Sequence, residues 1–239
     1  ADPAGNSFYV PYTGNLDKRS CSDGSVVWSE AVSNISLTAD MMVLNDQVFV
    51  ATTDGDVEKR DAGDGTLEAT FEAGASVELP LLGDGQMIYV TPKSSKVYKV
   101  DVSTMDTVWE KDIGKVNTGP AFMGFTGQPA QRTGILYAAA EDSVYRITDN
   151  GSSATIDWTY WAGDTVSSGP IEYDGVLYFG REGGRYYAVE DNGTSGDLVN
   201  KWPYVGASGN ADTGPWIDRG NSRAIFATTG GDLEAFELE

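Results

Sequence analysis

Histidine is absent from this chain of 239 residues, and Cys21 is its only cysteine. The usual general base and the usual metal ligand are therefore missing, and one cysteine can form neither an internal disulfide nor a cysteine-based zinc or redox site. Carboxylate, lysine or tyrosine chemistry stays open. No apolar stretch reaches the roughly 20 residues that a membrane-spanning helix needs. These absences favour a chain without a transmembrane segment and without catalysis.

Basic side chains are also scarce, because 16 Lys and Arg face 36 Asp and Glu and the net charge is −20. Such a charge repels nucleic acid and anionic membranes and favours cations or basic partners. We therefore expect no nucleic-acid partner. The same acidity is typical of a well-solvated surface, so the charge alone names no ligand.

A short apolar run with a central aromatic residue recurs along the whole chain. The aromatic residues are Tyr9, Phe49, Tyr89, Tyr137, Tyr178 and Phe226, at steps of 40, 40, 48, 41 and 48 residues. Each is followed seven or eight residues later by a second apolar position: Leu16, Val57, Val97, Val144, Tyr186 and Leu233. A period near forty indicates a repeat fold, and the inner spacing predicts a hairpin of two strands in each repeat.

Two further elements complete each repeat. The one after the hairpin carries a large aromatic residue, at Trp28, Phe71, Trp109, Trp158 and Trp202, and the one before it follows Pro80, Pro120, Pro170 or Pro215. Four strands in about forty residues predict the antiparallel blade of a β-propeller. The predicted fold class is all-β: one β-propeller domain over residues 1–239, with six four-stranded antiparallel blades of which the first and last are incomplete. Residues 1–6 are expected to be a disordered or vector-derived leader.

The segment from Val97 to Trp109 resembles the repeat of the quinoprotein alcohol dehydrogenase-like (PQQ-like) propellers, approximately V-Y-A-L-D-A-x-T-G-x-x-x-W. Asp101 stands eight residues before Trp109, although Met105 replaces the glycine of the pattern. In the second repeat Asp61 and Gly65 fit the pattern, but Ala69 occupies the tryptophan position. The resemblance implies the repeat architecture. The PQQ enzymes of this family also have eight blades, a calcium site, a catalytic aspartate and, in many members, a vicinal disulfide that a single cysteine cannot form.

Polar residues mark the start of the predicted innermost strands, where a propeller would gather them at one rim of its central channel. These rim residues are Thr38, Asp40, Glu78, Asn117, Thr118, Ser167, Ser168, Asp212 and Thr213. They could hold the polar groups of a small ligand, or a cation such as calcium with Asp40, Glu78 and Asp212 as its metal ligands. The alternative is that they satisfy strand-start amides and bind water.

The longest segment predicted to be irregular spans residues 123–134. It carries Phe125, Gln128 and Arg132, which we predict to form a partner-binding loop, since insertions on a rigid repeat scaffold often bind.

A second aromatic surface is suggested by Trp158, Tyr160 and Trp161 beside Asp157 and Asp164. Aromatic rings next to carboxylates are typical of carbohydrate recognition. The alternative is that these rings belong to a packing strand, whose successive side chains face opposite ways.

Three sequons make Asn34, Asn150 and Asn192 candidates for glycosylation. The chain begins Ala1-Asp2-Pro3, which fits a mature or trimmed protein. We therefore expect an extracellular, periplasmic or organelle-lumenal location.

These observations favour a non-catalytic binding or scaffold module that contacts a protein or glycan partner through its rim loops. The resemblance implies the same range of roles, namely envelope assembly factors, sensor ectodomains of kinases and lumenal stress sensors. Two alternatives stay open: a cofactor- or metal-dependent enzyme with its site in the central channel, and a calcium-binding surface protein. No cofactor other than calcium is suggested by the residues.

Overall fold

The computed structural model describes residues 5–83, 85–114, 124–126, 134–206, 209–211 and 214–238, with the backbone alone for 124–126. The chain divides into two compact units, Ala1–Glu110 and Lys111–Glu239. Over the described residues all regular structure is β-strand, in six antiparallel sheets. The all-β class and the antiparallel meander are confirmed. The single domain and the set of six blades stay predictions.

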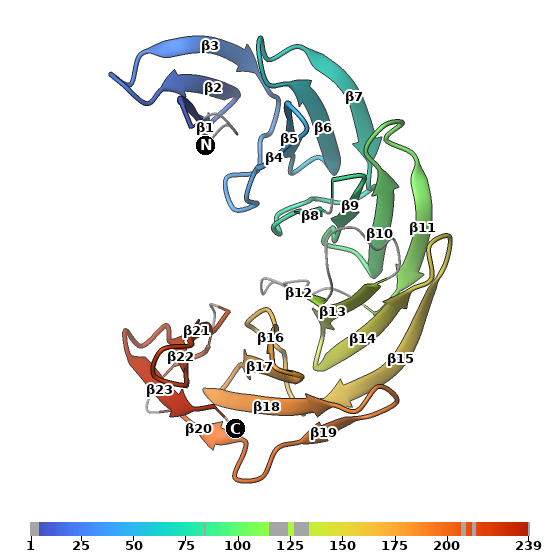
Figure 1. The fold of residues 1–239 in the computed structure, drawn as a ribbon, viewed down its shortest axis with the longest axis vertical. Helices are drawn as coiled ribbons and strands as arrows, with labels where there is room; N and C mark the ends of the chain where they lie inside the picture. Colours follow the sequence, from blue (N-terminus) through green and yellow to red (C-terminus); the bar gives the residue numbers. More distant parts are fainter. Residues whose placement is uncertain are drawn as a thin grey trace. The chain divides into compact units, whose positions relative to one another are not determined.

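The first unit holds three sheets, with strand orders β1-β2-β3, β4-β5-β6-β7 and β8-β9-β10-β11 (Figure 1). Their bounds are β1 (Ser7–Tyr12), β2 (Asn15–Ser20), β3 (Val26–Ala31), β4 (Met42–Leu44), β5 (Gln47–Ala51), β6 (Asp56–Asp61), β7 (Leu67–Glu72), β8 (Leu82–Gly83), β9 (Met87–Val90), β10 (Lys96–Asp101) and β11 (Thr107–Asp112). Neighbouring strands in each sheet follow one another in the sequence, so each sheet is built from short turns alone.

The second unit also holds three sheets. Their strands are β12 (Gly124–Thr126), β13 (Gly134–Ala140), β14 (Ser143–Asp149) and β15 (Ala154–Trp161), then β16 (Ile171–Tyr173), β17 (Val176–Arg181), β18 (Arg185–Asp191), β19 (Gly196–Leu198) and β20 (Tyr204–Val205), then β21 (Trp216–Asp218), β22 (Arg223–Ala227) and β23 (Leu233–Glu237). Both β19 and β20 pair with β18, so this sheet has five strands.

The aromatic repeat predicted from the sequence forms the core. All six central aromatics lie in strands, and each is at most 9% exposed. The predicted hairpin partners are equally buried except Leu233, which is 78% exposed at the start of β23. That strand ends its sheet and has no outer neighbour within the described residues, so nothing described covers this side chain.

Two other local predictions are wrong. Trp202 was expected in a strand, but it lies between β19 and β20. Lys201 adopts a left-handed backbone (φ 73°) and Pro203 has no amide hydrogen to pair, so the outer strand is interrupted here. Residues 123–134 were expected to be wholly irregular, but Gly124–Thr126 forms β12, which pairs with β13.

The first two sheets are joined through one acceptor, the carbonyl oxygen of Ala62. Its donors are the Tyr9 hydroxyl at 3.3 Å, the Lys18 ammonium at 2.8 Å and the Trp28 indole N–H at 3.3 Å. Register explains the convergence, because Lys18 lies between the other two donors, opposite Tyr9 on β1 and Trp28 on β3. We call this arrangement of three donors on one acceptor in the next sheet a clasp.

A second clasp joins two sheets of the other unit and uses a carboxylate. Asp191 accepts from the Tyr137 hydroxyl, from Arg146 Nε at 2.7 Å and from the Trp158 indole at 3.0 Å. Burial by itself would raise the pKa of Asp191, but the three side-chain donors together outweigh it and the pKa is lowered. Burial and the Asp191 charge raise the pKa of Tyr137 far above its usual value, so its hydroxyl stays a donor.

In each clasp the tryptophan covers a glycine of the next sheet, Gly65 in a turn and Gly196 at the start of β19, and leaves room there for only a hydrogen. A Cβ on Gly65 would lie 2.9 Å from the Trp28 ring, and one on Gly196 would lie 2.9 Å from the Trp158 ring. Gly65 also has φ +83°, which other residues adopt with strain. The glycine of the repeat is therefore required by the tryptophan of the preceding sheet.

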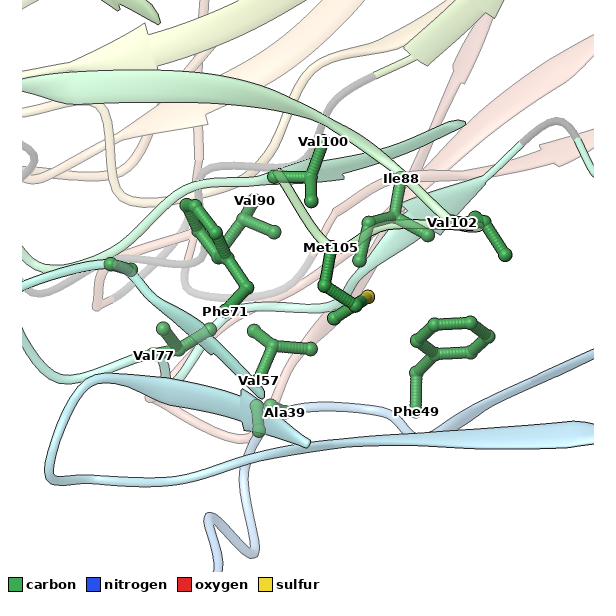
Figure 2. Close-up of a cluster of buried hydrophobic side chains, with 12 residues drawn as sticks. Ala39, Phe49, Val57, Phe71, Val77, Ile88, Val90, Val100, Val102 and Met105 are labelled. Atoms are coloured by element: carbon green, nitrogen blue, oxygen red, sulfur yellow. The ribbon is translucent and has the colours of Figure 1, made fainter. Parts of the chain in front are cut away.

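The next pair of sheets has the opposite sizes at these two positions, a small residue on the outer strand and a large residue on the turn. Ala69 pairs with Lys59 where Trp28 pairs with Lys18, and Met105 holds the left-handed position (φ 59°) that Gly65 holds one sheet earlier. Met105 is 4% exposed within a hydrophobic cluster of the first unit, and Ala69 packs against that cluster. Figure 2 shows the Met105 side chain among residues of both sheets. A large residue on the turn and a small residue on the outer strand thus share one cluster, from which we infer that Met105 fills the space that Ala69 leaves.

This reciprocal arrangement predicts energetic coupling between positions 69 and 105. Met105→Gly should lower the free energy of unfolding by about 2 kcal/mol, because the lost packing exceeds the backbone strain that is relieved. Ala69→Trp should destabilise by about 1–3 kcal/mol through overpacking. The double variant should be more stable than the sum predicts by about 1 kcal/mol or more in urea unfolding. Additive effects would contradict the reciprocal packing.

The carboxylate clasp predicts a pH-dependent contribution to stability. Because the folded pKa of Asp191 is lowered, its contribution is present above the unfolded value of about 3.9 and is lost as the pH falls through the folded pKa. Asp191→Asn should lower the free energy of unfolding at pH 7 by about 2 kcal/mol and flatten its pH dependence below pH 5. Asp174→Asn, the same change in an exposed turn, is the control. Equal urea midpoints for the two variants would refute the role of the clasp.

Candidate functional site

Two predicted rim residues of the first unit meet in the structure. Thr38 Oγ1 donates to the Glu78 carbonyl oxygen at 3.0 Å. The Glu78 carboxylate is 2.5 Å from Lys93 Nζ and accepts from Ser76 Oγ at 2.8 Å. These two donors lower the pKa of Glu78, Lys93 more than Ser76. Asp40 is exposed. Both Thr38 and Glu78 are thus bound into the fold by contacts of their own.

The rim hydroxyls of the second unit are buried. Ser167 Oγ donates to the Ala211 carbonyl at 2.8 Å, which links the start of one sheet to the segment before the next. Ser168 Oγ accepts from the Gly180 amide at 2.6 Å, and Ser168 is 0% exposed. Both hydroxyls thus bond to backbone groups of the second unit.

The remaining predicted residues lie mostly outside the described part of the chain. They are Asn117, Thr118, Gln128, Arg132, Asp212 and Thr213. Phe125 is described by its backbone only, as the β12 residue opposite Leu136. The rim site and the partner-binding loop stay predictions.

A metal or PQQ site finds no support among the residues that the structure describes. None of them forms a group of three His, Cys, Asp or Glu side chains able to hold an ion. The carboxylate of Glu78, one of the predicted metal ligands, already forms an ion pair with Lys93. Asp212, another predicted ligand, lies outside the described residues, so the metal site stays a prediction.

The three sequon asparagines are exposed, and each uses its amide nitrogen locally. Asn34 donates to Asp54 at 2.7 Å, Asn150 to Thr155 at 3.0 Å and Asn192 to Asp197 at 2.8 Å. Asn150 lies in the turn between β14 and β15, and Asn192 lies in the turn between β18 and β19. Glycosylation at the three positions stays a prediction.

The structure separates the predicted aromatic cluster into two faces. Trp158 is buried in its clasp, and Tyr160 packs against Phe179 and Tyr187 at centroid distances of 6.2 and 6.0 Å. Trp161, the last residue of β15, is 69% exposed. The packing alternative therefore describes two of the three rings, and Trp161 is left on the surface.

Trp161 is held in place by the hairpin tip that joins β13 to β14. Its indole Nε1 donates to Asp142 Oδ2 at 2.7 Å, while Asp142 Oδ1 accepts from Ser143 Oγ at 2.9 Å. A methyl-sized group at Gly163 would touch the edge of the Trp161 ring at 3.7 Å, so the backbone after β15 lies beside the ring. One hydrogen bond thus orients the exposed ring toward the hairpin tip.

The segment that follows Trp161 is tied to two hairpins. The amides of Ala162 and Val166 donate to the carbonyls of Asp142 and Glu141, both at 2.8 Å. Asp164 pairs with Arg181 at the end of β17 at 2.9 Å. We call Trp161, the hairpin tip Glu141–Asp142 and residues 162–166 the Trp161 platform.

The sequence analysis missed the cations of the middle strands. They are Lys18, Lys59, Lys99 and Arg146, which follow the central aromatic by nine or ten residues. Lys99 is 1% exposed and Lys59 is 8% exposed. Asp157, which the sequence placed with the exposed aromatics, instead pairs with Arg146. Their nearly constant distance in sequence from the central aromatic residue could have identified these cations.

Antiparallel meanders of this kind, six of them among the described residues, are the architecture of β-propeller proteins. The sequence matches, over residues 4–192, the family described as outer membrane protein assembly factor BamB. The chain belongs to this BamB-like family of PQQ-repeat propellers, which confirms the predicted repeat family.

Solved structures share the fold. BamB from Moraxella catarrhalis aligns with a TM-score of 0.65 at 18% identity, over 96% of this chain and 69% of its own. A chain from the crystal structure of the mitotic checkpoint complex aligns with a TM-score of 0.69 at 12% identity, over 98% of this chain and 72% of its own. Such identities establish the fold alone. A search of curated proteins finds no significant match to the sequence, and the described residues include no helix that could cross a membrane.

The rim geometry predicts the outcome of a calcium titration. We expect calcium to leave the thermal midpoint unchanged, because Lys93 and Ser76 already use the Glu78 carboxylate. A bound ion at a hundredfold excess over its Kd would instead add about 2.7 kcal/mol. Scanning calorimetry in calcium and in chelator makes the comparison. A rise that Asp40→Asn and Glu78→Gln each abolish would overturn this expectation and establish a metal site.

Proposed function

We propose that this chain is a non-catalytic binding module that contacts a protein or glycan partner through loops at the ends of its strands. The family name describes an outer membrane assembly factor, and this supports a scaffold role and a periplasmic or outer-membrane-associated location. The absence of histidine and the single cysteine agree with a role that needs no catalytic centre.

The observation that carries the proposal is the Trp161 platform. Trp161 is 69% exposed, and tryptophan is among the residues that contribute most to protein interfaces. Its Nε1 bond to Asp142 fixes the ring before a partner arrives. A fixed side chain loses little conformational entropy on binding, so more of the contact energy becomes affinity.

The predicted rim offers less to a partner. Ser167 and Ser168 are buried, and their hydroxyls contact backbone groups of the same unit. Glu78 is paired with Lys93. The Trp161 platform, by contrast, presents one exposed indole at the end of β15 beside two loops, and binding residues are commonly found on the loops of rigid scaffolds.

The proposal predicts that Trp161→Ala abolishes retention of the partner from an envelope extract of the source organism. Trp216→Ala is the matched control, because Trp216 is an exposed tryptophan (64%) in the same unit. Both variants should keep their free energy of unfolding within about 1 kcal/mol, since exposed side chains contribute little. Retained material is identified by mass spectrometry and by elution with free sugars. Equal retention by the wild type and Trp161→Ala would refute the platform as the binding site.

A further inference from the structure

The groups around the Trp161 ring are predominantly acidic. Glu141 and Asp142 form the hairpin tip beside it, and Asp112, the last residue of β11, is close enough for its charge to act on Tyr145. The charges of these carboxylates act together on the pKa of Tyr145 on β14. Burial raises the pKa of its hydroxyl, and the charges of Glu141, Asp142 and Asp112 raise it further.

The carboxylate that holds the ring keeps capacity for another donor. An ionised carboxylate offers about four acceptor positions. Asp142 uses one on each oxygen, for Trp161 and for Ser143. An incoming cation can therefore bond to Asp142 without displacing the indole.

Arg181 is the described cation that contacts the platform, and it already forms an ion pair and a hydrogen bond. It pairs with Asp164 at 2.9 Å and donates to the Tyr187 hydroxyl at 3.2 Å. Glu141 and Asp142 form no ion pair among the described contacts. The platform thus combines an exposed ring with negative charge that the described contacts leave uncompensated.

We propose that the partner of the Trp161 platform is a basic protein segment whose arginine or lysine stacks on the Trp161 ring and pairs with Asp142 and Glu141. Tryptophan is the strongest aromatic partner of a cation, and adjacent carboxylates bind the same group from its edge. The net charge of −20 attracts such a segment from a distance. This inference rests on the proposed function and names the partner's chemistry.

A neutral glycan fits the platform less well. A sugar could stack on the ring, but its hydroxyls carry no charge to offset the carboxylates beside Tyr145. A guanidinium meets both demands at once, since it stacks on aromatic faces and binds carboxylates with two parallel hydrogen bonds.

The test is a titration of the full chain with an octapeptide of alternating glycine and arginine, capped at both ends. The matched probe has citrulline in place of each arginine, which keeps the shape and removes the charge. A third probe is maltohexaose. Binding is followed by the indole N–H signals in ¹H–¹⁵N NMR spectra, and Trp161→Ala assigns the reporting signal. We expect the arginine peptide alone to shift the Trp161 signal, with less binding at higher salt.

Two variants separate the ring from the charge. Trp161→Ala should weaken arginine-peptide binding about fivefold, as the loss of a cation–π contact implies, while Trp216→Ala should not. Asp142→Asn keeps an acceptor for the indole and should weaken binding by about threefold. Urea midpoints verify that each variant is folded.

Equal binding by the wild type and Trp161→Ala would overturn the inference and show only general attraction to an acidic chain. A Trp161 shift with citrulline peptide or maltohexaose, at equal or higher affinity, would overturn it in favour of a neutral ligand. If the arginine peptide fails while Trp161→Ala still abolishes partner retention, the inference is wrong and the proposed function stands. If Trp161→Ala also leaves partner retention unchanged, both the inference and the proposed function are wrong.

Discussion

The clasp is the constraint on which the rest of the fold depends. A single acceptor in one sheet must satisfy a phenol, a cation and an indole from the sheet before it, and these three groups come from three successive strands. The carbonyl of Ala62 and the carboxylate of Asp191 perform the same task with different atoms. Since a buried donor without a partner is costly, the register of each meander is fixed by this convergence. The glycine turn then follows, because the indole leaves no room for a side chain at Gly65 or Gly196.

Much of this architecture could be predicted from the sequence, because the aromatic period follows directly from four strands and three turns. The reciprocal exchange could not. In the sequence, Ala69 and Met105 each depart from the repeat pattern. Only the register and the shared hydrophobic cluster indicate that Met105 fills the space that Ala69 leaves. The middle-strand cations were hidden for another reason. Lysine in an alternating strand normally faces water, whereas Lys99 is 1% exposed. The interruption at Trp202 depends on the local backbone at Lys201, which no periodicity encodes.

The candidate site was less predictable than the fold. Thr38 and Glu78 do meet, but no pattern in the sequence indicates that Lys93 and Ser76 already occupy the Glu78 carboxylate. The sequence also did not show which of the adjacent aromatic residues in β15 is buried and which is exposed. Alternation puts Tyr160 inside and Trp161 outside only once the clasp fixes Trp158. The partner of Trp161 was then Asp142, from a hairpin tip 19 residues away, rather than its sequence neighbours.

These observations suggest how a repeat protein of this kind can divide structure from function. Positions that serve the clasps point between sheets and tolerate change only in compensating pairs. Hairpin tips carry no such duty, so Glu141 and Asp142 can supply a charge and an anchor without disturbing the register. The platform nevertheless gains its rigidity from the repeat, because the strand that presents Trp161 is the same strand that a buried Trp158 holds against its neighbour. An exposed ring held in this way costs the fold little, and the strand that presents it is positioned by the satisfaction of buried donors in the clasp.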